Sequence, residues 1–100
     1  MRRIAKRDAN EGAIVDALRD CGVEVERLSG PGMPDLLCRR GARAPVFLEV
    51  KAPVGPRGGG GGRLTEVQVK SLPVWGAHVV RDVGEALEAI GIVRTARYRP

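Results

Sequence analysis

The fold is constrained most by residues 32–51, where two short apolar runs each carry one acidic side chain. The second run reads Pro-Val-Phe-Leu-Glu-Val-Lys and ends at Lys51. Side chains along a strand point alternately to its two faces, so Glu49 and Lys51 should project from the same face. Asp35 opens the first run. A hairpin turning through residues 41–43 would bring these three charged groups to one point.

Two carboxylates and an ammonium group in one place could bind a metal ion and act on a phosphate. Carboxylate oxygens are ligands for Mg²⁺, which usually takes one or two of them together with water and substrate phosphate. A lysine beside the metal can stabilise the charge of a phosphate in the transition state, or help to orient or deprotonate an attacking water. The alternative is that Glu49 and Lys51 form the solvated face of an amphipathic strand, since Glu-x-Lys is common by chance.

The composition is typical of a single globular domain with a polyanionic partner. The chain has 100 residues, of which 43% are apolar and 29% charged. Its net charge of +5 favours nucleic acid or an acidic membrane as partner. No apolar run approaches the roughly 18 residues of a membrane span, and no signal-peptide core follows the basic start. We therefore expect a cytoplasmic protein, neither secreted nor membrane-bound.

Cys21 and Cys38 lack the CxxC spacing of a zinc site. We interpret both as small buried hydrophobic residues in a reducing compartment.

The first helix should begin near Asp8 or Asn10, both good N-caps, and end at residues 21–22. Glu11 lies three, four and seven positions before the apolar residues of this helix and so shares their inward face. A carboxylate on the buried side needs a partner or a purpose. The alternative is that it only interacts with the helix dipole in the first turn. The apolar stripe consists of Ile14, Val15 and Leu18.

Alternation and turn signals predict the other elements in the order helix, three strands, helix, strand, helix. This order describes an α/β layer with a mixed sheet. The second helix should begin near Leu64 with Thr65 as its cap, and Pro73 should disturb or end it. Gln68 lies on its inward side, although Thr65-x-x-Gln68 also fits a capping box. The remaining predictions are strands at 23–28, 35–39, 45–52 and 77–81, and a helix at 82–91 with Leu87 and Ile90 inward.

Two basic segments flank the predicted core of residues 8–90, and one loop interrupts it. Residues 1–7 form a basic arm and residues 92–100 a basic tail, and each either contacts phosphates or has no such role. Residues 53–63 form a flexible, glycine-rich loop that is not a P-loop, because Gly-Lys-Ser/Thr is absent. Its two arginines would make it a basic lid over nucleic acid; the alternative is a disordered insertion. No second domain is expected.

Pro34-Asp35, followed after a hairpin by Glu49-Val50-Lys51, resembles the PD-(D/E)xK nuclease superfamily. Within it, the chain is most similar to the stand-alone VRR-NUC (virus-type replication-repair nuclease) domain over about residues 8–90. The resemblance implies a restriction-endonuclease-like core. The residues on which the resemblance rests are Glu11, Gly32-Met33-Pro34-Asp35-Leu36, Phe47-Leu48-Glu49-Val50-Lys51, Leu64-Thr65-Glu66-x-Gln68 and the segment 76–87.

The resemblance also implies a role for each residue of the site. Asp35 and Glu49 would coordinate a divalent metal, Mg²⁺ or Mn²⁺, with the main-chain carbonyl of Val50. Lys51 would act on the water or the phosphate. Glu11 would help to bind the metal or its waters, and Gln68 would support the site from the second helix.

The resemblance therefore implies a metal-dependent DNA endonuclease of replication or repair, in a bacterial or phage-infected cell. It would act as a homodimer, selective for branched DNA such as the Holliday junction. The main alternative is a non-catalytic nucleic-acid-binding module on the same fold. A further alternative is a small subunit that contributes one site to a larger complex. A restriction enzyme is disfavoured, because no segment resembles a dedicated base-reading element.

Overall fold

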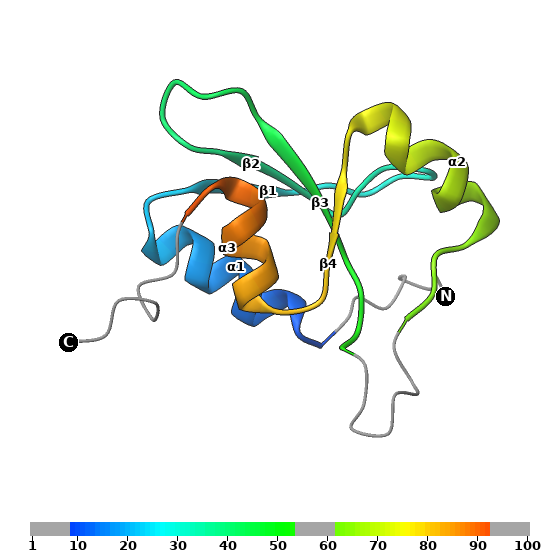
Figure 1. Cartoon of the computed structure of the whole chain (residues 1–100), viewed down its shortest axis with the longest axis horizontal. Coiled ribbons are helices and arrows are strands. Elements are labelled where there is room, and N and C mark those ends of the chain that lie inside the picture. Colours follow the sequence, from blue (N-terminus) through cyan, green and yellow to red (C-terminus); the bar gives the residue numbers. More distant parts are fainter. Residues whose placement is uncertain (1–8, 54–61, 93–100) are drawn as a thin grey trace, which may run out of the picture.

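The apolar stripes of the sequence meet between one sheet and two helices in the computed structural model, which describes residues 9–53 and 62–92 (Figure 1). Together they form a small α/β domain with a four-stranded mixed sheet and three helices. The order of elements is the predicted one. They are α1 (Glu11–Asp20), β1 (Glu24–Arg27), β2 (Leu36–Arg39), β3 (Val46–Val50), α2 (Glu66–Trp75), β4 (His78–Val80) and α3 (Val83–Ile90).

The strands follow one another in the order β1-β2-β3-β4. The first three pair antiparallel, whereas β3 and β4 pair parallel, with α2 in the connection between them. The predicted hairpin is confirmed: Leu36 lies opposite Leu48, and Gly41 takes the positive φ of +60° that its turn requires. The parallel pair places Val50 beside Val80 at the end of the sheet.

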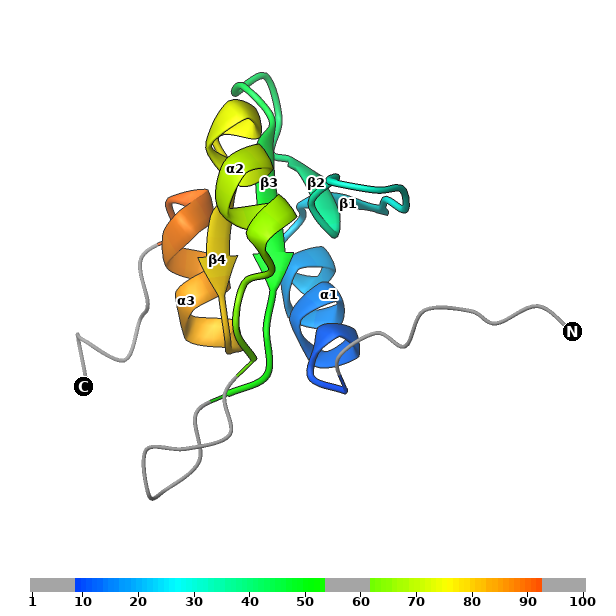
Figure 2. The same ribbon diagram turned by 90° about the vertical axis from the view of Figure 1, so that its right-hand side faces the viewer.

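The two faces of the sheet are covered by different helices (Figure 2). Helices α1 and α3 pack against each other and against one face, where the core lies. Helix α2 lies on the other face, where Trp75 packs edge-on against Phe47 with ring centroids 5.1 Å apart. Leu48 and Val50 therefore enter the core, while the intervening Glu49 turns toward α2. The core includes Ile14, Val15, Leu18, Leu36, Cys38, Leu48, Val50, Val80, Ala86 and Ile90.

Some details differ from the sequence predictions. Cys38 is buried as expected, but Cys21 is exposed, because it lies at the C-cap of α1 beyond the buried stripe. Pro73 does not end α2, which continues to Trp75 and stops where Gly76 adopts φ +65°. A proline in the last helical turn removes one hydrogen bond only, and the αL glycine then satisfies the terminal carbonyls.

Several predictions fall on other parts of the chain. The basic arm, most of the glycine-rich loop and nearly all of the basic tail lie outside the described residues. None of the helices described is both long and apolar enough to span a bilayer.

Candidate active site

Asp35 and Glu49 meet at the end of the hairpin. Asp35 immediately precedes β2, and its Oδ2 accepts a 2.8 Å hydrogen bond from the backbone N–H of Val50, which anchors the carboxylate beside β3. Both acidic side chains, together with Lys51 and Gln68, line one cavity of about 530 Å³. The turn at residues 28–33 and the first turn of α2 form its other walls. The hairpin thus brings together the three charged groups that the sequence singled out.

Glu49 is a buried carboxylate that its neighbours satisfy only in part. It is 3% exposed. Its Oε2 accepts a hydrogen bond from Gln68 Nε2 at 2.6 Å and lies 3.6 Å from Lys51 Nζ. Its Oε1 is buried and has no hydrogen-bond partner among the residues that the structure describes.

The environment raises the pKa of Glu49 to about 7. The main cause is burial, followed by the negative charge of Asp35; Lys51 and Gln68 act in the opposite direction. A buried carboxylate facing a second carboxylate is a position that a bound cation would stabilise.

Gln68 serves the helix and the site at once. Its backbone N–H donates to Thr65 Oγ1 at 3.1 Å, and its Oε1 accepts from the Thr65 backbone N–H at 3.0 Å, which completes a capping box. The other half of the same amide, Nε2, donates to Glu49. The two interpretations of Gln68 are therefore compatible, because a primary amide carries both an acceptor and a donor.

Glu11 is buried as predicted, but it faces a different partner. Its side chain is 3% exposed, and its Oε2 accepts a 2.8 Å hydrogen bond from Arg27 Nε on β1. Glu11 does not line the cavity that holds Asp35 and Glu49. Within residues 9–53 and 62–92, no three His, Cys, Asp or Glu side chains form a group that could hold a metal ion. The role of Glu11 at a metal stays a prediction.

The sequence did not lead us to predict Arg27 as the partner of Glu11, although the buried position of Glu11 indicated that a partner was needed. An acidic side chain on the buried face of a helix needs a cation or several donors. Arg27 belongs to the strand that follows α1 and lies two residues after Val25, so both side chains project from the same face of β1. Two further polar residues, Asn10 and Arg81, donate hydrogen bonds to the backbone just after β3.

The donor set fits a hard divalent cation. Asp35 and Glu49 both line one cavity, and the buried Glu49 Oε1 has no hydrogen bond from the described residues. Carboxylate oxygens are the ligands that such a cation prefers. Val50 also lines the cavity. Its carbonyl as a third ligand stays a prediction.

Comparison with known proteins adds no assignment: no family model, no curated protein and no solved structure matches this chain. The fold and the site define a small α/β domain with a carboxylate–lysine cavity on the α2 face of its sheet.

Proposed function

We propose that this protein is a metal-dependent DNA endonuclease with a restriction-endonuclease-like core, of the VRR-NUC type within the PD-(D/E)xK superfamily. The observation that carries the proposal is the single cavity shared by Asp35, Glu49 and Lys51. The incomplete satisfaction of Glu49 supports it, because a structural carboxylate would be expected to have partners at both oxygens.

Each residue of the site then has a distinct task. Asp35 and Glu49 would hold Mg²⁺ or Mn²⁺, which supplies Lewis-acid polarisation of the phosphoryl group and acidification of water. Lys51 donates hydrogen bonds toward the negative charge that develops on the phosphate, or orients the attacking water. Gln68 fixes the Glu49 carboxylate through its 2.6 Å hydrogen bond.

The proposed substrate is branched DNA and the proposed assembly is a homodimer. The net charge of +5 favours a polyanionic partner. A domain of this size offers little surface to hold a duplex, and a symmetric dimer would provide two sites for paired cuts. Exposed apolar side chains on α2, beside the cavity, are compatible with contact to a second copy. They are Val67, Val69 and Val74.

The proposal is tested with end-labelled four-way junction, flap and linear duplex DNA in Mg²⁺ or Mn²⁺. We expect cleavage of at least the junction, and a fall in kcat on the order of 100-fold or more in Lys51→Ala. Lys70→Ala removes an exposed lysine from α2 and should retain kcat, which controls for the loss of one positive charge. Absence of cleavage on every substrate, or unchanged cleavage by Lys51→Ala, would reject the proposal.

A non-catalytic DNA-binding module is the second candidate. It is favoured by the pairing of Glu11 with Arg27, which leaves two rather than three carboxylates at the cavity. Calorimetric titration with Mn²⁺ separates the candidates. The endonuclease predicts one binding event that Asp35→Asn abolishes, whereas the binding module predicts DNA binding without any such event.

A further inference from the structure

The backbone on both sides of Lys51 is held by hydrogen bonds beyond the end of β3. The Lys51 N–H donates to Val80 O at 3.0 Å. The Lys51 carbonyl accepts from Asn10 Nδ2 at 3.1 Å, and the next carbonyl, that of Ala52, accepts from Arg81 Nη1 at 2.7 Å. The peptide groups that flank the Lys51 Cα are therefore both fixed, although the strand itself ends at Val50.

Asn10 joins the ends of two neighbouring strands. Its Nδ2 donates to the Arg81 carbonyl at 2.8 Å as well as to the Lys51 carbonyl. Asn10 occupies the N-cap position of α1, but its side chain makes no capping hydrogen bond. The parallel register that pairs Val50 with Val80 places Lys51 beside Arg81, so one side-chain amide can reach both carbonyls. The usual capping function of asparagine has been replaced by a contact to the Lys51 backbone.

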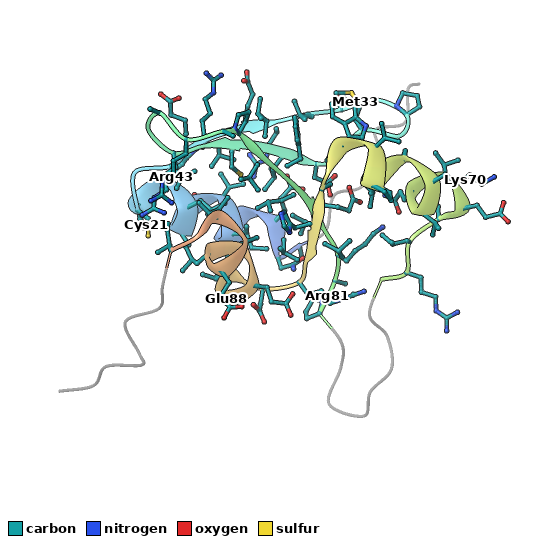
Figure 3. The ribbon with its side chains drawn as sticks, turned by 45° about the horizontal axis from the view of Figure 1, so that its top comes forward. Cys21, Met33, Arg43, Lys70, Arg81 and Glu88 are labelled. Atoms are coloured by element: carbon teal, nitrogen blue, oxygen red, sulfur yellow. The ribbon has the colours of Figure 1, made fainter. Side chains whose placement is uncertain are left out.

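Arg81 in turn places the backbone of Gly62 against the Lys51 side chain. Figure 3 shows Arg81 beside the chain that follows β3. Its Nη2 donates to the Gly62 carbonyl at 2.9 Å while Nη1 holds Ala52. A Cβ atom at Gly62 would lie 3.3 Å from Lys51 Cδ and 3.4 Å from Ala52 N. Gly62 is thus packed against the aliphatic part of Lys51, with no room for a further carbon unless the lysine shifts.

We propose that Asn10 and Arg81 are positioning residues for Lys51. They fix its backbone directly, and Arg81 restrains its side chain through Gly62, so that the ammonium group stays 3.6 Å from Glu49 Oε2. A lysine side chain is long and flexible, and an error of about 1 Å in the position of a reacting group can lower a rate on the order of 100-fold. The catalytic importance of this positioning rests on the proposed function, whereas the positioning itself does not.

The positioning is measured without activity by NMR of the lysine side chains. The chain has three lysines, Lys6, Lys51 and Lys70, so the ¹³Cε resonance of each can be assigned from single Lys→Arg variants. In the native chain, ¹³Cε relaxation should give the Lys51 side chain a higher order parameter than that of the exposed Lys70. In Arg81→Ala and Gly62→Ala, we expect the order of Lys51 to fall toward that of Lys70. Equal order in the native chain and both variants would overturn the proposal.

The kinetic test uses the same variants on junction DNA. Arg81→Ala and Gly62→Ala should lower kcat about 10- to 100-fold with KM unchanged. Arg39→Ala, which removes an exposed arginine from β2, should leave both constants unchanged. A general loss of fold would instead lower the active fraction without changing KM or the order of Lys51 in the folded fraction. Gly62→Ala keeps the side-chain hydrogen bonds of Asn10 and Arg81. It is therefore the variant that tests the proposal if Arg81→Ala does not fold.

Failure of the two proposals can be told apart. If the native protein cleaves no DNA but Lys51 loses order in the variants, the endonuclease proposal fails and the positioning stands. If the native protein cleaves DNA and the variants match it in kcat and in the order of Lys51, the positioning proposal fails alone.

Discussion

Replacing Glu49 by glutamine should stabilise the cation-free protein while removing the proposed activity. Burial and the charge of Asp35 raise the pKa of Glu49 from 4.5 to about 7. A pKa difference of about 2.5 between the folded and unfolded chains corresponds to about 3 kcal/mol. That free energy is the penalty for keeping the ionised carboxylate in the folded protein, where it is 3% exposed.

The sign of the pH dependence follows from proton binding. Between about pH 4.5 and pH 7 the folded chain holds a proton on Glu49 that the unfolded chain has released. The free energy of unfolding therefore decreases as the pH rises through this window, and the full penalty is present above it. Glu49→Gln carries no charge, so it should remove most of the penalty at pH 8 and change little at pH 4.

The expected gain at pH 8 is about 3 kcal/mol, because the raised pKa already includes the favourable effect of Lys51 on the ionised carboxylate. Gln68 Nε2 can still donate to the amide oxygen of the variant. The measurement is urea unfolding in EDTA at several pH values between 4 and 8. Glu24→Gln, which changes an exposed glutamate on β1, is the matched control. A Glu49→Gln protein no more stable than this control at pH 8, or a gain independent of pH, would refute the reasoning.

Three further predictions concern the ion pair, the thiols and the cation. Arg27→Ala should lower the free energy of unfolding by about 1–3 kcal/mol in urea titrations, because the buried Glu11 carboxylate loses the hydrogen bond from Arg27; an unchanged value would contradict this. The exposed Cys21 should react with a thiol reagent in the native protein, whereas Cys38 should react only on unfolding, since burial raises its pKa to about 11. Mg²⁺ or Mn²⁺ should raise the thermal midpoint of the native chain but not that of Asp35→Asn, and equal shifts would exclude Asp35 as a ligand.

The arrangement of the hairpin could be predicted from the sequence because a strand has a fixed side-chain period. Alternation alone separated Leu48 and Val50, which enter the core, from Glu49, which faces α2. The glycine-containing turn then set the register that brings Asp35 to the end of β3. These features depend on contacts close in sequence, which local pattern specifies well.

The partners of polar side chains could not be predicted in the same way. Helical periodicity correctly placed Glu11 on the buried face of α1, but periodicity does not say which strand residue meets that face. Asn10 was interpreted as a helix cap, yet its amide instead joins the ends of β3 and β4. In both cases the outcome depends on tertiary packing across elements, which can override a local preference of about 1 kcal/mol for capping.

The same features that make Glu49 unfavourable in the cation-free fold would favour binding of the proposed cation. Its burial and the neighbouring charge of Asp35 raise its pKa to about 7, so near neutral pH a proton and a divalent cation would compete for one carboxylate. Binding of the cation would relieve the repulsion between the two carboxylates and thereby couple occupancy of the site to folding stability. In a domain of 100 residues, where total stability is about 5–15 kcal/mol, a penalty of about 3 kcal/mol is a substantial fraction of that stability. Glutamine at this position should therefore stabilise the cation-free protein, whereas under the proposed function the cavity needs the negative charge of Glu49.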